Sequence, residues 1–546
     1  MAETTLALAL AVVTTLAAGL YLLMQLKLLG KGGKLPPGPW AHIPLFGDGV
    51  YLAAGNPLKF FFDRFKRYGP VYRTVMLGSR AWIITDMEAM RGALRDEGAV
   101  LRVPFKSFQA LMGGDSLLDR EGAHGPWRRI FNSALGPPSL AAMVPRILAV
   151  MRGHLGAWEA QGRIPIYRAA RQMGVDLGVD IITRVELSER VDRDWFKKEV
   201  ETFLDGLYGL PLTLPGMPLA KALAARERLI AALMPEMESK HAAFRDKWAE
   251  TGSTPAAFTS ALLDVPGGVR SQAEVEAEAD ARAAAQGTPA PPAPASAFPT
   301  TPSVLLASWM GRACIEKCEL WDAGLSVLHN LVASSDTTRF ALFNTWTLLA
   351  MSPRVQEQLF LEQKKVVAQH GGAITYAVAS QMPYMDATLK EAMRLLPASA
   401  GGLRELTADL RVGEHVIPKG EIVWYHAGLL HCVDPTLWDG RTDYDLPPHM
   451  DWKGNFEGAF RPERWLGEGP KPRHYTFGSG LHLCAGMQLV YLEIKLLLTL
   501  VLRHYSLRLE TPDMLARCPR CFPFFVPEPG TDGVLLLPRE EPLPTE

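Results

Sequence analysis

The pattern of apolar and polar residues predicts a mainly helical chain with a few strands. Amphipathic stretches with the helical period occupy residues 139–160, 168–186, 193–208 and 219–250. Two strand-like pieces, PVYRTVML and AWIITD, flank Gly78, an arrangement typical of a β-hairpin. The pattern therefore indicates a helix-rich fold with small β-sheets.

A second feature is a long apolar segment without breaks. From Lys317 to Met351 the chain contains no proline, and Gly324 is its one glycine. A helix of this length is about 50 Å long, and its apolar residues lie nearly all round, which predicts burial. Its middle reads ASSDTT, where the Thr337 hydroxyl can bond to the Ala333 carbonyl and loosen the helix.

The N-terminal segment, 1–34, differs from the rest of the chain. About twenty apolar-dominated residues precede Lys27, Lys31 and Lys34, a length that can span a bilayer as a helix. Because the basic residues follow the apolar stretch, we expect a retained single-pass anchor with the bulk of the chain on the cytosolic side. The endoplasmic reticulum is the expected membrane, and an organellar membrane is the alternative. The proline-rich KLPPGPW then leads into one large domain, 35–546.

Composition and charge narrow the class of protein. Of 546 residues, 48% are hydrophobic and 21% are charged, which suits a large packed core. The formal net charge is −1 and there is no basic tail, so nucleic acid is not an expected partner. Six cysteines in so long a chain do not indicate a secreted disulfide scaffold. Residues 266–303 are rich in Ala, Pro, Glu and Ser, and we expect a disordered surface insertion there.

One cysteine has a setting that suggests metal binding. Cys484 lies in HYTFGSGLHLCAG, and we expect a helix that begins at this cysteine. A helix N-terminus stabilises a thiolate, and Gly478, Gly480 and Gly486 allow a flat ligand to approach the backbone closely. A single thiolate without nearby Cys or His partners is a poor zinc site, but it is what a haem iron with an axial cysteine requires.

Four motifs, in order along the chain, resemble those of the cytochrome P450 family. The segment from Phe477 to Gly486 is similar to the haem-binding signature F-x-x-G-x-H/R-x-C-x-G. KEAMR, with Glu391 and Arg394, is similar to the E-x-x-R helix, and FRPERW supplies Arg464 as the expected third member of that buried network. ASSDTT is similar to A/G-G-x-D-T-T. The resemblance covers essentially the whole chain apart from the insertion.

The resemblance implies a cytochrome P450 fold, mainly α with small β-sheets and a long central helix over the haem. The domain 35–546 would be a haem-thiolate catalytic domain in which Cys484 binds the iron of haem b. Glu391, Arg394 and Arg464 would be structural residues that fix the cysteine segment. Four residues would bind the haem propionates, with surface salt bridges as the alternative: His124, Arg128, Arg404 and His482. The other expected cofactor contacts are Phe477, Gly480 and Gly486.

The resemblance also implies a catalytic pair in the long helix. Asp336 and Thr337 would form an acid–alcohol pair that delivers protons on the distal side of the haem. Ser334 departs from the family pattern, which has glycine at this position. Its side chain would add bulk and a hydroxyl where O₂ should lie.

The implied substrate pocket is apolar and suits a flat lipid. Segments 97–119 and 203–229 would cover it, and ordinary core packing is the alternative role for their large side chains. The expected pocket residues are Phe105, Phe108, Leu111, Met112, Leu207, Tyr208, Leu212 and Ala333.

The implied function is monooxygenation of a hydrophobic small molecule of the sterol, terpenoid, carotenoid or retinoid class. Substrate, O₂ and two electrons from an NADPH-dependent P450 reductase would give a hydroxylated product and water. Cytochrome b5 or a ferredoxin is an alternative redox partner. Within the family, the chain most resembles the retinoic-acid hydroxylases and the plant steroid and terpenoid oxidases. Two alternatives stay open: a reductase-independent isomerase or dehydratase acting on lipid peroxides, and a non-enzymatic haem-binding protein.

Overall fold

The computed structural model describes most of the chain: residues 15, 19, 21–23, 35–39, 47–48, 51, 56–76, 79–95, 98–101, 106–113, 135–183, 191–207, 211–251, 319–518 and 525–545. The predicted anchor 1–34 lies almost entirely outside the described residues, and the predicted insertion 266–303 lies wholly outside them. Four predicted site residues also lie outside them: Phe105, His124, Arg128 and Tyr208.

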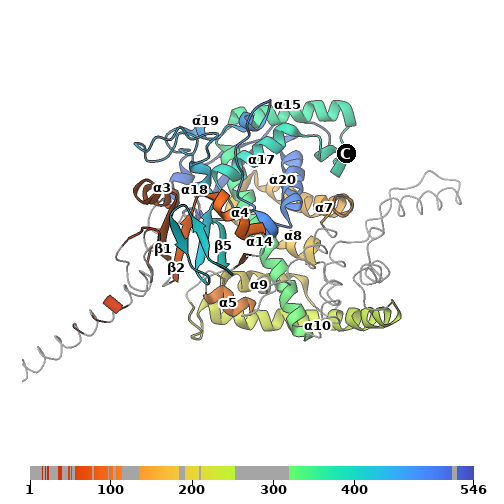
Figure 1. The fold of residues 1–546 in the computed structure, drawn as a ribbon. Helices are drawn as coiled ribbons and strands as arrows, with labels where there is room; N and C mark the ends of the chain where they lie inside the picture. The colour runs from red at the N-terminus through yellow and green to blue at the C-terminus, as the bar shows by residue number, and fades with distance from the viewer. Residues whose placement is uncertain are drawn as a thin grey trace, which may run out of the picture.

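Helices form most of the described chain (Figure 1). The α-helices are α3 Pro57–Tyr68, α4 Met87–Arg95, α5 Lys106–Met112, α7 Pro137–Gln161, α8 Ile166–Leu177, α9 Arg193–Asp205, α10 Pro218–Thr251, α14 Leu320–Ala350, α15 Pro353–His370, α16 Tyr376–Ala379, α17 Pro383–Leu395, α18 Ala427–Cys432, α19 Phe456–Ala459 and α20 Met487–Leu502. Shorter helical turns are η1 Gly178–Thr183, which is π-helical, and the 3₁₀ turns η3 Pro462–Trp465, η4 Gly480–His482 and η5 Met514–Arg517.

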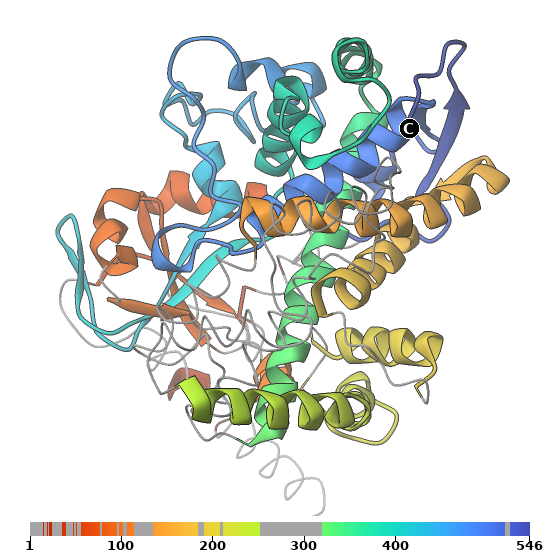
Figure 2. The same cartoon turned by 90° about the vertical axis from the view of Figure 1, so that its right-hand side faces the viewer.

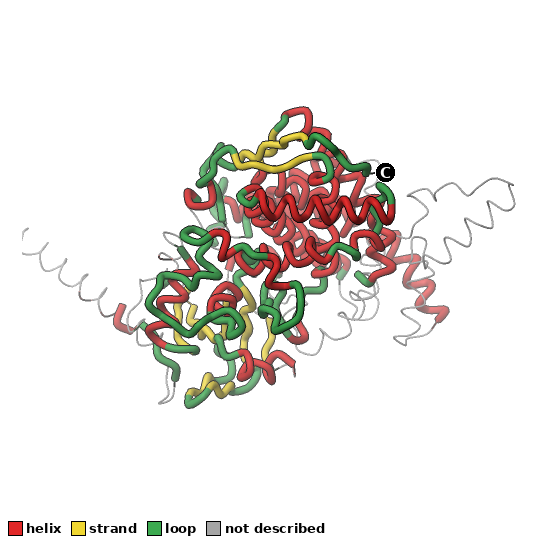
Figure 3. Tube along the Cα trace, turned by 90° about the horizontal axis from the view of Figure 1, so that it is seen from above, coloured by secondary structure: helices red, strands yellow, loops and turns green. Residues whose placement is uncertain are grey.

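The strands form small sheets at the periphery of the helices (Figure 3). The largest sheet has the order β1-β2-β8-β5-β3, a second has the order β4-β10-β9, and β6 pairs with β7. The strands are β1 Val71–Met76, β2 Ser79–Ile84, β3 Ala99–Leu101, β4 Arg163–Pro165, β5 Gly401–Leu406, β6 Leu410–Val412, β7 His415–Ile417, β8 Ile422–His426, β9 Tyr505–Leu509 and β10 Gly533–Pro538.

The structure confirms the elements predicted from periodicity. The predicted hairpin is the antiparallel pair β1 and β2, and the four amphipathic stretches are α7, α8 with η1, α9 and α10. The long apolar segment is α14, which passes through the middle of the molecule with other helices around it (Figure 2). Its N-terminal half contributes to one apolar cluster with α5, α9 and α10, and its C-terminal half to a larger one with α7, α8, α17 and α20.

A further apolar helix stands out among the described residues. Gly480–Leu502 is long and apolar enough to cross a membrane, but 72% of its apolar window is buried inside the protein. Its burial follows from its place in the larger apolar cluster, beside α7, α15 and α17. We therefore assign the helical part of this segment, α20, to the protein core.

Candidate active site

The cysteine segment forms a tight loop ahead of α20. The Cys484 amide donates to the Phe477 carbonyl at 2.9 Å, and the Cys484 thiol is exposed. Gly480 has a φ of +72°, and a Cβ on it would lie 2.3 Å from the Leu94 carbonyl oxygen, so this position requires glycine. The sequence-based expectation that the helix begins at the cysteine is wrong. The helix begins three residues later, at Met487, because the loop geometry continues through Gly486.

Arg404 is a buried cation that lacks a carboxylate partner among the described residues. Its side chain is buried, with the residue 2% exposed, and burial lowers the pKa of the guanidinium. Nη1 donates to the Leu403 carbonyl and Nη2 to the Tyr425 hydroxyl, at 2.9 and 3.0 Å. Within the described chain, Nε has no hydrogen-bond partner. A buried guanidinium without an acid is costly unless an anion binds to it.

Tyr425 connects this arginine to the cysteine loop. Tyr425 lies on β8 directly opposite Gly402 of β5, and a Cβ on Gly402 would lie 2.1 Å from the tyrosine ring. The same hydroxyl is 3.3 Å from where a Cβ on Gly478 would stand. The glycines of both segments therefore leave room for the ring that brings Arg404 beside the loop of Cys484.

Glu391, Arg394 and Arg464 meet in one buried network. Both oxygens of Glu391 accept from Arg394, at 2.8 and 2.9 Å, and Arg464 Nε lies 3.1 Å from Oε1. Trp465 Nε1 also donates to Glu391, at 2.9 Å. Despite full burial of the carboxylate, the two arginines hold the pKa of Glu391 below its ordinary value. The network joins α17 to η3, the segment that precedes the cysteine loop.

A stripe of residues on α14 is open although the helix is central. Five residues between Ala323 and Ala350 are half-buried or exposed, and all the remaining residues of this stretch are buried. At 3.6 residues per turn the half-buried and exposed residues lie within an arc of about 140°. We call this set the open stripe: His329, Asn330, Ala333, Ser334 and Thr337.

The hydroxyls of the open stripe bond to the helix itself. Thr337 Oγ1 donates to the Ala333 carbonyl, the contact predicted from the sequence. Ser334 Oγ donates to the Asn330 carbonyl at 2.8 Å, and a Cβ on Gly178 of η1 would lie 3.1 Å from it. The Ser334 hydroxyl thus lies beside η1, where α8 and η1 pack against α14.

Asp336 lies on a different side of the helix from Thr337. It is buried against α8, and its Oδ1 lies 3.5 Å from Arg339 Nη1. Burial raises the pKa of Asp336, while Arg339 and Arg171 oppose that increase. Arg171 in turn donates to Asp205 at 2.6 Å, near the surface of α9. The described side chains therefore connect Asp336 to charged groups on the side away from the open stripe.

Sequence reasoning missed a buried acid on the helix after the cysteine. Glu493 of α20 is buried, and its Oε2 lies 3.5 Å from the Thr338 hydroxyl of α14. Burial raises the pKa of Glu493 to about 8. The contact places α20 beside α14 one residue beyond the open stripe. A signal was available: Glu493 interrupts the apolar run LVYLEIKLLL.

The predicted pocket residues do not form one group. Leu111, Met112 and Leu207 are buried in the apolar cluster of α5, α9 and α10. Phe108 packs against that cluster and is half-buried. Leu212 is 43% exposed in the loop between α9 and α10. Among the described pocket residues, only Ala333 belongs to the open stripe.

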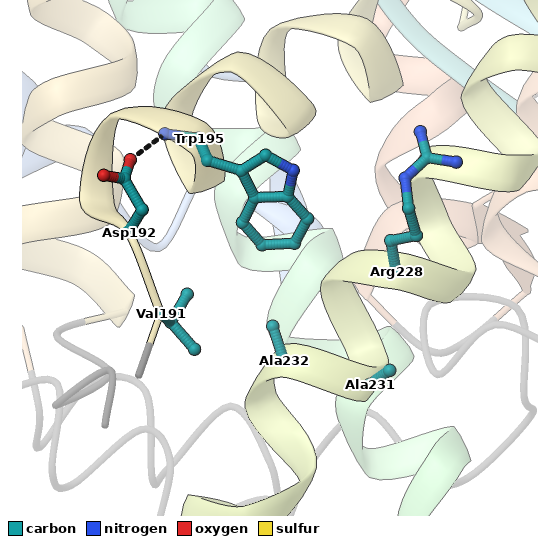
Figure 4. Close-up of a pocket in the computed structure, with 6 residues that line it drawn as sticks. All are labelled: Val191, Asp192, Trp195, Arg228, Ala231 and Ala232. Atoms are coloured by element: carbon teal, nitrogen blue, oxygen red, sulfur yellow. Dashed lines mark hydrogen bonds between the residues drawn. The ribbon is translucent and has the colours of Figure 1, made fainter. Parts of the chain in front are cut away.

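A separate groove of about 470 Å³ lies between the start of α9 and the middle of α10 (Figure 4). The Trp195 ring and the Ala232 methyl group border it, and Arg228 at its edge pairs with Glu199 at 2.7 Å. None of its lining residues belongs to α14, β5 or the cysteine loop. The complete lining is Val191, Asp192, Trp195, Arg228, Ala231 and Ala232.

An exposed cysteine on a glycine loop, a buried arginine beside it with no carboxylate partner in the described chain, and a central helix with an open face are the arrangement expected of a haem-thiolate protein. Comparison with known proteins agrees. The family model for cytochrome P450 matches residues 36–251, 319–449 and 457–528. The chain therefore belongs to the cytochrome P450 family, and it is a P450 monooxygenase.

Three relatives illustrate the match. The chain is 27% identical to abscisic acid 8'-hydroxylase 2 of Oryza sativa subsp. indica, over 85% of this chain and 79% of that one. It is 25% identical to cytochrome P450 120 of Synechocystis sp., over 86% of this chain and 90% of that one. A solved structure, retinoic acid bound cyanobacterial CYP120A1, aligns with a TM-score of 0.63 and 22% identity, covering 93% of this chain and all of the other. That likeness shows the fold.

Family membership implies a haem-iron cofactor, and the described residues fit it. The orphaned Nε of buried Arg404 suits a propionate, and the Cys484 thiol is accessible for the iron. His482 is half-buried at the end of η4, in the same loop as Cys484. Tyr425 is a further site residue that the sequence analysis did not predict. No local pattern marks it, because its contact with Arg404 depends on which strand pairs with β5.

Proposed function

We propose that this chain hydroxylates a hydrophobic small molecule of the sterol, terpenoid, carotenoid or retinoid class, with electrons from an NADPH-dependent reductase. The observation that carries the proposal is Arg404, a buried cation without an acid partner in the described chain, set beside the loop of Cys484. The names of the relatives support the substrate class, since one is an abscisic acid hydroxylase and another binds retinoic acid.

The described residues would have two roles: some would bind the haem, and others would fix the loop of Cys484. Cys484 would bind the iron, and Arg404 with His482 would bind the propionates; Phe477, Gly480 and Gly486 would shape the loop. The bound haem supplies the O₂ activation and oxygen insertion. Glu391, Arg394 and Arg464 would hold the loop in place.

On α14, Thr337 would hold a proton on the open face. Its hydroxyl donates to the Ala333 carbonyl, which leaves the oxygen lone pairs available to accept from water or substrate. Asp336, on the side of α14 that packs against α8, would be the proton donor that resupplies Thr337, because burial raises its pKa. To reach Thr337 its proton must pass around the helix through water, since the Asp336 side chain faces α8.

The proposed location is a membrane, with residues 1–34 as the anchor. Leu22 and Leu23 are 59% and 66% exposed, as expected for side chains that face lipid. Leu214, in the loop between α9 and α10, is 64% exposed. These apolar groups would place the protein where lipid-soluble substrates partition.

The decisive experiment is a reduced carbon-monoxide difference spectrum of purified protein. We expect a strongly red-shifted Soret band that Cys484→Ala abolishes and Cys518→Ala, a matched thiol change outside the loop, retains. Titration with sterol, terpenoid, carotenoid and retinoid panels then identifies ligands from their effect on the haem spectrum. Hydroxylation that requires NADPH and reductase supports the proposal; conversion of lipid peroxides without reductase would support the isomerase alternative instead.

A further inference from the structure

The N-terminal part of the open stripe carries two polar side chains that have no role in the proposed reaction. His329 and Asn330 are half-buried, on a helix segment whose neighbouring residues Leu328 and Leu331 are fully buried. The side-chain amide of Asn330 makes no hydrogen bond within the described part of the chain; only its backbone carbonyl is engaged, by Ser334. A half-buried amide in apolar surroundings is unfavourable unless something hydrogen-bonds to it.

The half of α14 that carries these two residues contributes its buried side chains to an apolar cluster of the described chain. This half of α14 packs in the cluster formed by α5, α9 and α10, which includes Leu111 and Leu325. The open stripe contains no lysine or arginine, so an anion bound there would lack a fixed positive charge from α14. A neutral oxygen substituent is the group that an amide with one donor face and one acceptor oxygen can hold.

The spacing sets a distance for the ligand. Asn330 and Thr337 are seven residues apart, which is about two turns or about 10 Å along the helix axis. Both lie on the same open face, so one molecule of lipid size can lie along the stripe and contact both ends.

We infer that Asn330, assisted by His329, holds a hydroxyl or ketone oxygen of the substrate. The substrate is thus an already oxygenated lipid, with its polar group about 10 Å from the carbon that reacts beside Thr337. The inference rests on the proposed function and narrows its substrate class. An earlier oxidising or hydrating reaction must supply such a molecule.

Two matched ligand sets test this: farnesene, farnesol, farnesal and farnesoic acid, and cholestane, cholestanol and cholestanone. Each is titrated into haem-loaded wild type, Asn330→Leu, Asn330→Asp, His329→Leu and the surface control Gln358→Leu. Binding is read both from the haem spectrum and from equilibrium dialysis. Haem content and the carbon-monoxide spectrum establish that each variant is folded.

In wild type we expect the alcohol or carbonyl member of at least one set to bind about tenfold tighter than the hydrocarbon, as one well-made hydrogen bond allows. Asn330→Leu should remove that advantage and leave hydrocarbon binding within about twofold, a negligible free-energy change. At a pH high enough to ionise the new carboxyl group, Asn330→Asp should retain the alcohol and lose the carbonyl compound, because a carboxylate accepts but does not donate. Gln358→Leu should behave as wild type.

Three results would overturn the inference. Equal affinities of hydrocarbon and alcohol in wild type and Asn330→Leu would mean that the stripe serves water only. If farnesoic acid bound most tightly, a cationic side chain outside α14 would be binding the carboxylate of the ligand, in place of the contact between Asn330 and a neutral oxygen. Binding of no member of either set would overturn the proposed lipid class as well, and so differs from failure of the Asn330 contact alone.

Discussion

Arg394 and Arg404 are both buried arginines, and they differ in what surrounds them. Arg394 donates to both oxygens of Glu391, to the carbonyls of His449 and Ala459, and to the Met450 sulfur. Arg404 has one neighbouring carbonyl and one tyrosine hydroxyl, and its Nε is unpartnered within the described chain.

The difference separates groups that hold the fold from groups that await a ligand. A buried charge whose donors are all used adds rigidity, and removing a partner leaves an uncompensated charge. A buried charge with unused donors is unfavourable until an anion arrives, so ligand binding recovers part of the cost of burial. By this criterion we interpret the α17–η3 network as structural and propose Arg404 as a cofactor contact.

The largest predicted effect comes from breaking the satisfied network. Glu391→Ala leaves Arg394 buried without a carboxylate and should destabilise the fold by about 3–5 kcal/mol. The free energy of unfolding, measured with denaturant, checks this, and the yield of haem-loaded protein should fall with it. Glu414→Ala, at an exposed site between β6 and β7, is the control. A loss of less than 1 kcal/mol would mean that the network does not hold the fold.

Glu493 extends the comparison to a buried acid that has no cation partner among the described residues. Its pKa is about 8 in the folded protein against an ordinary value of 4.5. Between these values the folded state binds the additional proton, so stability should fall as pH rises, by up to about 1.4 kcal/mol per pH unit. Below pH 4.5 and above pH 8 this contribution should be flat.

Glu493→Gln tests this contribution directly. The amide cannot ionise, so the difference in unfolding free energy between variant and wild type should grow with pH inside the window. Denaturant unfolding at several pH values provides the measurement. Parallel pH profiles for the two proteins would show that Glu493 is ionised, or solvated, when folded.

Arg404 should give the opposite behaviour to Arg394. Arg404→Leu should leave the haem-free fold stable, while haem is lost faster, by a factor of about 10–100 for one charge-assisted hydrogen bond. Transfer of haem to an excess of apomyoglobin measures the rate, and calorimetry of the haem-free protein measures the fold. Unchanged haem retention would remove Arg404 from the cofactor site.

These contrasts show which parts of the site a sequence can reveal. Helical periodicity located α14, and the i, i+4 spacing correctly predicted the bond between Thr337 and Ala333. Apolar residue type alone does not distinguish a pocket residue from a core residue: Leu111 and Met112 were predicted to line a pocket, with core packing as the alternative, and both are buried in an apolar cluster. The partner of Arg404 depends on the β5–β8 register, which joins residues about twenty positions apart that no local pattern links.

Gly402 is the glycine that makes room for that partner. A methyl group at Gly402 would lie 2.1 Å from the Tyr425 ring, so Gly402→Ala must displace the ring or the strand. Overpacking of this kind typically costs about 1–3 kcal/mol. Because the displaced tyrosine is the side-chain partner of Arg404, haem loss should accelerate together with the loss of stability. Gly413→Ala, at a turn with open space around it but a φ of +57°, provides a backbone-strain control. If Gly413→Ala lowers stability by a similar amount and haem retention changes only in Gly402→Ala, the tyrosine contact, and not general destabilisation, positions Arg404 for the cofactor.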